Sequence, residues 1–508
     1  MGAIDASIVA VAIPHLRGAL GATVEEMAWV TTAFVIATVM VMPLTAFLGR
    51  LYGQRRVYLA SLVLFILGSA LCGVAASLPM MVFFRVLQGL GAGALQPTEQ
   101  AILRQTFPPE EQGMAMAVFG LAVVVGPALG PTLGGFLLDN YAWPWIFFIN
   151  LPVGLLALFM VTRFVHEPED IRQHNHEMAL KQRADMDWSG IALLSVGLAC
   201  LQYTLEEGSG HDWFESRAIA TCAVITVVAL AAFVYRELTA RAPAVDLTLF
   251  KDRVFLSGTL VGAMTFAVLM SITFLLPVFM QELLGFTAMQ AGQALMPRGL
   301  AMMVAIPIVG RLYNRVPPPL FISSGVLMVA FSAYTMAHYT LETSASSVVG
   351  AIILQGVGFA CLFVPLTTVA MARIPRYRLA DAAGLNALLR QIGGSLGLAA
   401  FATLLPDFVA EARAGLSAHV VAGNPEIAHR LAGLQQTLIS RGFDPYSALQ
   451  AAQRLLGQLV YREATVIAFE RMFMLAGLAF LLILPLVVFL KAPRLPAGAP
   501  PPEVPVEL

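Results

Sequence analysis

An apolar run in the first third of the chain reads Ala117-Val-Phe-Gly120-Leu-Ala-Val-Val-Val-Gly126-Pro127-Ala-Leu-Gly130-Pro131-Thr-Leu-Gly134-Gly135. Gly126, Gly130 and Gly134 share one helix face, and small residues at this spacing let two helix backbones approach closely in a membrane. Pro127 and Pro131 each remove a backbone hydrogen bond from the same turns. The run therefore predicts a membrane-spanning helix that packs tightly and bends. A glycine-rich helix contact in an unrelated membrane protein is the alternative.

The composition places the whole chain in a lipid bilayer. Of its 508 residues, 58% are hydrophobic and only 12% are charged, which is more apolar sequence than a soluble core requires. The formal net charge of -1 gives no indication of a nucleic-acid partner. The four cysteines stand in apolar segments without ligand spacing. We interpret them as small core residues and expect no metal site and no cofactor.

Apolar stretches of about twenty residues predict an all-α chain that crosses the bilayer fourteen times. The predicted spans are 1–16, 26–48, 58–76, 80–103, 114–138, 145–163, 189–206, 217–236, 254–281, 291–312, 320–338, 346–371, 380–404 and 464–490. Lysine and arginine concentrate in alternate connections, whereas the short loops on the opposite side hold only Arg17 and Arg217. The positive-inside rule therefore places the basic connections and both chain ends in the cytoplasm.

The first predicted span is short. Its sixteen residues rise about 24 Å, which is less than the roughly 30 Å of the hydrocarbon core. We therefore expect the chain to begin inside its first helix. A truly short helix that leaves Asp5 near the cytoplasmic interface is the alternative.

Two motifs recur along the chain in the same order. Gly49-Arg50-Leu51-Tyr52 returns as Gly310-Arg311-Leu312-Tyr313, and Leu87-Gln88-Gly89 returns as Leu354-Gln355-Gly356. Parallel repeats of this kind build transporters whose substrate site lies between the two halves. We therefore predict a six-helix bundle over 1–163, a linker with two inserted helices over 164–253, a second six-helix bundle over 254–490 and a disordered cytoplasmic tail over 491–508.

Further motifs carry a family resemblance. They include Asp5-Ala-Ser-Ile-Val-Ala-Val-Ala-Ile-Pro14, Trp29-Val-Thr-Thr-Ala-Phe34, Arg85-Val-Leu-Gln88-Gly89, the glycine run, Trp145-Ile-Phe-Phe-Ile-Asn150 and Asn386-Ala-Leu-Leu-Arg390-Gln391. Over nearly its whole length the chain resembles the fourteen-helix drug/proton antiporters of the EmrB/QacA type in the major facilitator superfamily. Ala10 stands where that family usually has asparagine, and the basic loop 49–56 lacks the family's usual acidic residue between its glycines.

The resemblance implies a major-facilitator fold and a secondary active transporter of the bacterial inner membrane rather than an enzyme. It implies export of amphipathic or cationic small molecules in exchange for protons, by alternating access. Export of one endogenous metabolite, lipid or siderophore is the alternative, followed by proton symport. An ATP-driven exporter is excluded because none of the lysines follows a glycine in a phosphate-binding loop.

Charged side chains inside predicted spans are costly and tend to face a cavity or a partner. The candidates for such a role are Asp5, Arg85, Glu99, Arg298 and Arg390. On the fourth span a polar stripe within an arc of roughly 80° comprises Arg85, Gln88, Gln96 and Glu99. The resemblance assigns the Arg85 position to proton coupling. Asp5 is the candidate acid, since a carboxylate at low dielectric can load a proton and release it when a cation approaches.

Each of these charges also has a structural interpretation. Arg85 could bond neighbouring carbonyls, Glu99 could reach the interface, and Asp5 could be exposed at the start of a short helix. In the second half, Arg298 and the pair Asn386 and Arg390 either line the substrate cavity or make structural hydrogen bonds. The resemblance makes Gly49 and Arg55 of the basic loop candidates for gating. We interpret Glu206 and Glu207, at the end of the seventh span, as a solvated interfacial pair, with a functional pair as the alternative.

Residues 405–463 form the one large piece outside the membrane on the predicted periplasmic side. Ile427, Leu431, Leu434 and Leu438 recur at helical spacing, and a turn at Gly442-Phe-Asp-Pro445 follows. This pattern predicts a hairpin of two amphipathic helices. The hairpin packs on itself or the membrane, or it docks a periplasmic membrane-fusion adaptor protein, as the resemblance implies.

Overall fold

Long helices make up the first half of the molecule. The computed structural model describes residues 1–108, 110–184, 187–240, 243–313, 315–420, 424–488 and 490. Regular structure in these residues is entirely helical, which confirms the predicted all-α class. The first half contains α1 (Gly2–Leu20), α2 (Val24–Val41), η1 (Met42–Leu44), α3 (Thr45–Tyr52), α4 (Gln54–Gly73), α5 (Leu78–Thr106), α6 (Gln112–Asn140), α7 (Trp145–Phe148) and α8 (Asn150–Phe164).

A linker and a second set of helices follow. The linker contains α9 (Glu169–Ala184), α10 (Trp188–Glu207), η2 (Ser209–His211), η3 (Trp213–Glu215), α11 (Arg217–Thr239) and η4 (Leu247–Lys251). The second half contains α12 (Arg253–Glu282), α13 (Ala288–Leu312), α14 (Pro318–Met336), α15 (Ala345–Val369), η5 (Arg376–Arg378), α16 (Leu379–Ser417), α17 (Pro425–Ser440), α18 (Pro445–Leu481) and α19 (Leu484–Val487). The predicted tail 491–508 lies outside the described residues.

Twelve helical segments in the described part of the chain are long and apolar enough to cross a membrane. They correspond to twelve of the fourteen predicted spans. The other two are α1 and α6, which are helical over 19 and 29 residues. Helix α1 ends at Leu20, beyond the predicted limit of 16, and its rise of about 28 Å is close to the thickness of the hydrocarbon core. The count of fourteen spans stays a prediction.

The repeated Gln-Gly motif makes equivalent helix contacts in the two halves. A Cβ added to Gly89 of α5 would lie 2.5 Å from the carbonyl oxygen of Phe34 on α2. One added to Gly356 of α15 would lie 2.6 Å from the carbonyl oxygen of Arg298 on α13. Because no side chain larger than glycine fits such a contact, the motif packs the fourth helix of each half directly on the second.

The glycine run lies on α6 and packs on α1. A Cβ added to Gly130 would lie 2.4 Å from Ser7 Oγ, and one added to Gly134 would lie 3.3 Å from Ile8 Cγ2. Gly126 is also buried. Pro127 and Pro131 lie within α6, although their side chains are outside the described part of the structure. The close approach of α1 and α6 depends on the absence of side chains at the glycines.

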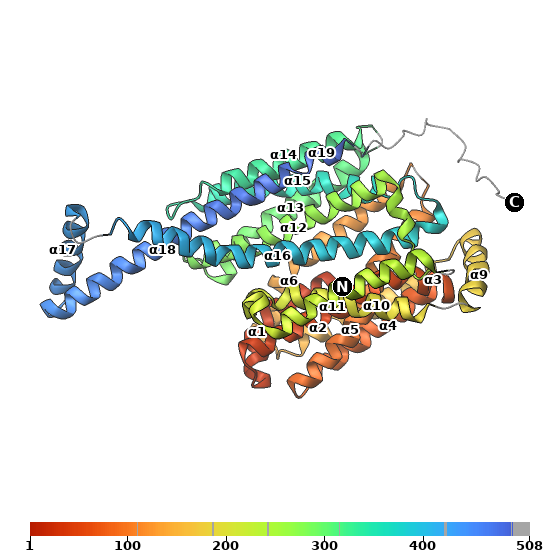
Figure 1. The fold of residues 1–508 in the computed structure, drawn as a ribbon, viewed down its shortest axis with the longest axis horizontal. Helices are drawn as coiled ribbons and strands as arrows, with labels where there is room; N and C mark the ends of the chain where they lie inside the picture. Colours follow the sequence, from red (N-terminus) through yellow and green to blue (C-terminus); the bar gives the residue numbers. More distant parts are fainter. Residues whose placement is uncertain are drawn as a thin grey trace.

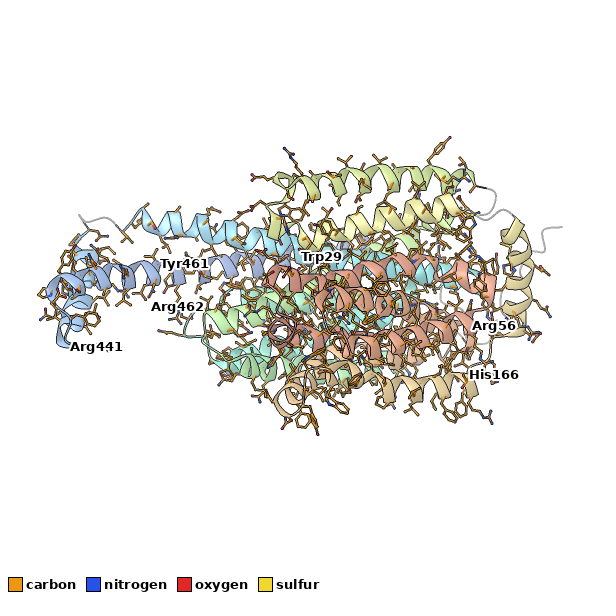
Figure 2. All side chains as sticks on the ribbon, turned by 90° about the horizontal axis from the view of Figure 1, so that it is seen from below. Trp29, Arg56, His166, Arg441, Tyr461 and Arg462 are labelled. Carbon is orange, nitrogen blue, oxygen red and sulfur yellow. The ribbon has the colours of Figure 1, made fainter. Side chains whose placement is uncertain are left out.

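The bundle has two chemically distinct ends. Figure 1 shows α17 at one end of the long axis and α3 and α9 at the other. Figure 2 places Arg441 at the first, which we call the hairpin end, and Arg56 and His166 at the second, which we call the basic end. Helix α16 continues past residue 404 to Ser417, and α18 begins at Pro445, where Asp444 caps it by accepting from Tyr446 N and Ser447 N. The first leg of the predicted hairpin is therefore the separate helix α17, and the second leg is the extended start of α18.

The two halves pack together near the basic end. Helix α6 contacts α13, where a Cβ added to Gly310 would lie 2.7 Å from Ala117 Cβ. Helix α16 contacts η1, where a Cβ added to Gly384 would lie 2.8 Å from the carbonyl oxygen of Met42. Between the halves, α10 and α11 pack on each other, and α10 also contacts α2 and α16. The inserted helices therefore contact both bundles.

Candidate functional site

A buried ion pair joins α1 to α5 in the first half. Arg85 Nη1 lies 2.7 Å from Asp5 Oδ2, and both side chains are 0% exposed. Two isolated charges would be costly at this depth, so each needs a partner. The arrangement excludes the prediction's structural alternative in which Asp5 is exposed at the start of the helix.

Amide side chains complete the coordination of the Asp5 carboxylate. Its Oδ1 accepts from Gln88 Nε2 at 2.9 Å and from Asn150 Nδ2 at 2.8 Å, and Asn150 also donates to Ser69 Oγ at 3.0 Å. The residues come from four helices, α1, α4, α5 and α8. Sequence reasoning missed Asn150 and Ser69, although a buried amide at the start of an apolar helix was a signal for the former.

The Arg85 guanidinium has further partners and one free donor. Its Nε donates to the carbonyl oxygen of Val30 at 2.9 Å, and its Nη1 donates to Gln88 Oε1 at 2.7 Å. The rings of Phe34 and Phe147 lie with centroids 4.6 and 5.6 Å from its Cζ. Nη2 is buried without a hydrogen-bond partner in the described structure.

The rest of the predicted stripe on α5 does not reach this cluster. Glu99 Oε1 instead accepts from Tyr58 Oη of α4 at 2.6 Å. Fourteen residues separate Glu99 from Arg85, which is about 21 Å along a helix. Gln96 is half-buried between them. The structure therefore brings together Asp5, Arg85 and Gln88, and it places Gln96 and Glu99 elsewhere.

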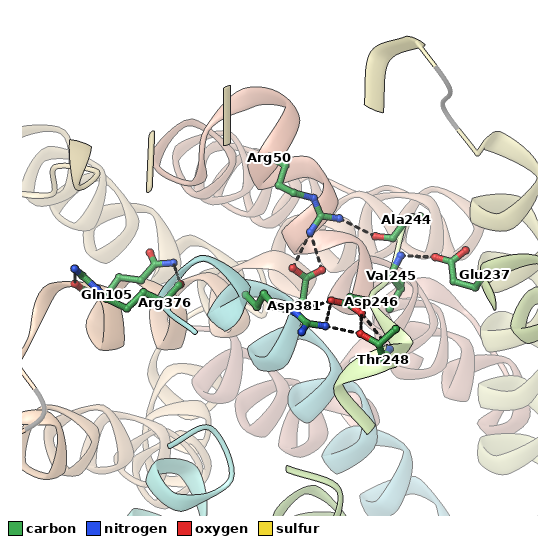
Figure 3. A network of polar contacts seen from close by, with 10 residues as sticks. Arg50, Gln105, Glu237, Ala244, Val245, Asp246, Thr248, Arg376 and Asp381 are labelled. Atoms are coloured by element: carbon green, nitrogen blue, oxygen red, sulfur yellow. Dashed lines mark hydrogen bonds and ion pairs between the residues drawn. The ribbon is translucent and has the colours of Figure 1, made fainter. Parts of the chain in front are cut away.

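A polar network at the basic end joins the two halves and the linker. Figure 3 shows Arg50 of α3 pointing at Asp381 of α16, with Arg50 Nη1 2.7 Å from Asp381 Oδ2. Arg50 Nη2 also donates to the carbonyl oxygen of Ala244 at 3.2 Å, and Arg378 donates to Asp246. The carboxylate partner of Arg50 is thus supplied by the other half of the chain.

The two residues predicted to gate this loop make contacts within the first half. Arg55 donates to the carbonyl oxygen of Thr162, and a Cβ added to Gly49 would lie 3.2 Å from Gln54 Cγ. Across the halves, Arg104 Nη1 donates to the carbonyl oxygens of Thr367 and Thr368, each at 2.9 Å. Sequence reasoning missed Arg50 and Arg104, because their partners lie hundreds of residues away.

The second half contains a cavity that Asn386 and Arg390 line, whereas Arg298 does not. Arg298 Nη1 donates to Thr273 Oγ1 at 3.0 Å and so ties α13 to α12. Of the two predicted alternatives, Arg298 therefore makes a structural hydrogen bond, whereas Asn386 and Arg390 line the cavity.

Comparison with known proteins identifies the family. The sequence profile of the Major Facilitator Superfamily matches residues 1–398. The chain belongs to this superfamily. It is 34% identical over 498 residues to the multidrug export protein EmrB of Escherichia coli strain K12, covering 97% of this chain and 93% of that protein. It is 32% identical over 493 residues to the fatty acid resistance protein FarB of Neisseria gonorrhoeae, covering 97% and 94%.

Solved structures agree with the superfamily's fold. The human organic anion transporter MFSD10 superposes with a TM-score of 0.59 at 16% identity, covering 96% of each chain. The proton:xylose symporter XylE superposes with a TM-score of 0.56 at 12% identity, covering 94% of this chain and 91% of that one. The chain is thus a multi-pass membrane transporter of the efflux branch and not an enzyme.

One feature of the inserted helices departs from the prediction. Glu207 is not solvated but 8% exposed, and it accepts from Thr32 Oγ1 of α2 at 3.0 Å. Its neighbour Glu206 accepts from Gln202 Nε2 at 2.7 Å and from Ser395 Oγ of α16 at 3.2 Å. The interpretation as a solvated interfacial pair is therefore wrong. The end of α10 is covered by both halves of this superfamily protein, which hydropathy along one helix cannot reveal.

A serine motif in α16 serves helix packing. Gly393-Gly394-Ser395-Leu396-Gly397 matches the Gly-x-Ser-x-Gly pattern of hydrolases, but it lies inside a 39-residue helix rather than on a turn between strand and helix. Cβ atoms added to Gly393 and Gly397 would lie 2.4 and 2.3 Å from carbonyl oxygens of α12. The glycines therefore bring α12 and α16 into close contact.

Proposed function

We propose that this protein is a proton-coupled multidrug efflux transporter that exports amphipathic or cationic small molecules from the cytoplasm. The carrying observation is the fully buried pair of Asp5 and Arg85, whose carboxylate also accepts from the side-chain amides of Gln88 on α5 and Asn150 on α8. Intramembrane ionisable groups of this kind form proton relays in transporters. The names of the relatives, multidrug export protein and fatty acid resistance protein, support the substrate class.

Coupling follows from the competition for one carboxylate. Ionised Asp5 holds Arg85 and two amide donors, so α1 stays fixed to α5 and α8. A proton on Asp5 removes its charge and weakens the ion pair, which frees α1 to shift against α5. Replacement of the Arg85 ion pair by a proton at Asp5 thus links proton entry to the change of conformation, and the change of conformation leads to substrate release.

The conformation fits one state of an alternating-access cycle. Arg50, Asp381 and Arg104 join the halves at the basic end, which the distribution of arginine assigns to the cytoplasm together with both chain ends. In such a cycle, a transporter that is closed at this end takes up or releases its substrate at the opposite end, which is here the hairpin end. The membrane is proposed to be the bacterial inner membrane, with the hairpin in the periplasm.

The hairpin is proposed to dock a periplasmic adaptor protein. Helix α17 has no buried residue in the structure, and its half-buried apolar residues lie on one face. Helix α17 also contacts α18, so its exposed side is the surface that it offers to a partner helix. A second candidate, export of a single lipid-like metabolite, is favoured by the similarity to the fatty acid resistance protein FarB.

Transport in proteoliposomes tests the proposal. Purified protein is reconstituted with an imposed pH gradient, and accumulation of ethidium and of a lipophilic weak acid is followed together with proton movement. We expect gradient-dependent accumulation in the wild type and none in Arg85→Ala. Transport that is indifferent to the gradient would refute proton coupling.

A further inference from the structure

The cavity in the second half is lined by a buried arginine, Arg390, whose charge has no counter-charge among the described residues. Its empty volume is about 450 Å³, including the part open to solvent. Helices α12, α13, α15 and α16 form its walls, and most of the lining is apolar or aromatic, including Phe266, Phe359 and Phe363. Arg390 is the charged side chain in the lining, and it is 5% exposed.

No hydrogen bond or ion pair of Arg390 is present among the described residues. Its Nε is buried without a partner. Its nearest favourable neighbours are the rings of Phe266 and Phe363, whose centroids lie 5.4 and 5.8 Å from its Cζ. Ring faces compensate only part of the desolvation of a guanidinium, because they supply no acceptor for its five N–H groups.

The first half contains a buried arginine that is paired with a carboxylate. Arg85 is equally buried, and its charge is paired with Asp5 at 2.7 Å. The equivalent of Arg85 in the repeated motif is Ile352, which is fully buried and apolar. The second half therefore does not repeat the ion pair of Asp5 and Arg85. The charge of Arg390 is available to an anionic group from outside the chain.

Other polar atoms of the cavity are also without partners. Thr265 Oγ1 is buried without a hydrogen bond in the described structure, and Asn386 lies one helical turn from Arg390 on α16. Gly262 lies beside the stem of Arg390, because an added Cβ would be in ordinary van der Waals contact with its Cγ at 3.6 Å. A guanidinium, a hydroxyl and an amide on one side of an apolar chamber match a carboxylate on a hydrophobic body.

We propose that this cavity is a binding site for amphipathic monoanions, in which Arg390 pairs with the carboxylate and Phe266, Phe359 and Phe363 contact the apolar body. The proposal rests on the proposed export function and refines its substrate class. The cavity also touches the first half, because Phe363 stacks on Phe119 of α6 with ring centroids 6.4 Å apart. An occupant therefore lies against the contact between the halves.

Binding of 2-naphthoate to the full-length protein in detergent tests the site. Equilibrium dialysis with 2-naphthoate is compared with neutral 2-naphthamide and cationic 2-naphthylmethylammonium, in the wild type and in Arg390→Gln, Arg390→Lys and Arg298→Gln. We expect Arg390→Gln to weaken naphthoate binding by roughly ten- to a hundredfold and to leave the amide unchanged, because a charge-assisted hydrogen bond is lost. Arg390→Lys should bind naphthoate better than Arg390→Gln, and Arg298→Gln should bind it like the wild type.

The outcomes separate this site from the proposed function. Unchanged naphthoate binding in a folded Arg390→Gln protein overturns the proposal, and so does an equal loss for the amide, which would indicate shape rather than charge. Proton-driven export of cations without any naphthoate binding overturns the site alone. Naphthoate binding that depends on Arg390, without proton-driven export of any compound, supports the site and refutes the proposed function.

Discussion

Replacing Gly130 by alanine should destabilise the contact between α1 and α6. The new Cβ would lie 2.4 Å from Ser7 Oγ and 2.5 Å from Ser7 Cβ, well inside van der Waals contact. Gly135 lies on the same helix, and an added Cβ there meets no described atom within 4 Å. Both substitutions gain the same helix propensity, so their difference isolates the overlap. Overpacking of this kind costs about 1–3 kcal/mol.

Unfolding in mixed micelles, followed by circular dichroism during titration with dodecyl sulfate, measures the difference. We expect Gly130→Ala to unfold with a free energy about 1–3 kcal/mol lower than Gly135→Ala. Ser7→Gly removes both overlapping atoms and leaves the carbonyl oxygen of Ile4 at 3.3 Å, so the double variant should recover most of the loss. Equal stability of the two alanine variants would show that α1 does not pack on this face of α6.

The other predictions concern the charged groups. Arg85→Ala should abolish proton-driven export in proteoliposomes while the protein remains in the membrane, and normal export would remove Arg85 from the coupling. Asp5→Asn should lose substrate-induced proton release, whereas Asp5→Glu should keep part of it; a pH-sensitive dye reports both, and wild-type release from the asparagine variant would contradict the assignment. Asp381→Asn leaves Arg50 without its carboxylate and should speed the labelling of a cysteine introduced at the basic end. The exchanged pair Arg50→Asp with Asp381→Arg should slow this labelling again. Equal labelling of all variants would show that the ion pair does not hold the basic end closed.

The ion pair in the first half could be predicted because burying a charge costs free energy and because two opposite charges occur in predicted spans of the same bundle. A charge inside an apolar span needs a partner, and Asp5 and Arg85 were two such charges on helices of one bundle. The glycine contacts at 130 and 134 were visible for a similar reason, since spacing on one helix defines a face. What the spacing could not show is which helix lies opposite, and that helix is α1.

Contacts between distant segments could not be predicted in this way. Arg50 and Arg55 look alike in the basic loop, yet Arg50 reaches Asp381 in the other half and Arg55 stays with Thr162. The burial of Glu207 likewise depends on Thr32, which lies 175 residues earlier. A single sequence carries local periodicity, but the choice among equivalent charges is made by the packing of the two halves.

The neighbouring carboxylates at the end of α10 restrict how the molecule can move. Glu207 is bonded to Thr32 in the first half, and Glu206 to Ser395 in the second. Consecutive Cα atoms are fixed about 3.8 Å apart, so one short segment holds both halves at a nearly constant separation. Any rocking motion that widens this separation has to release at least one of the two hydrogen bonds. In the proposed alternating-access cycle, the bond that is released first would decide which half the end of α10 follows.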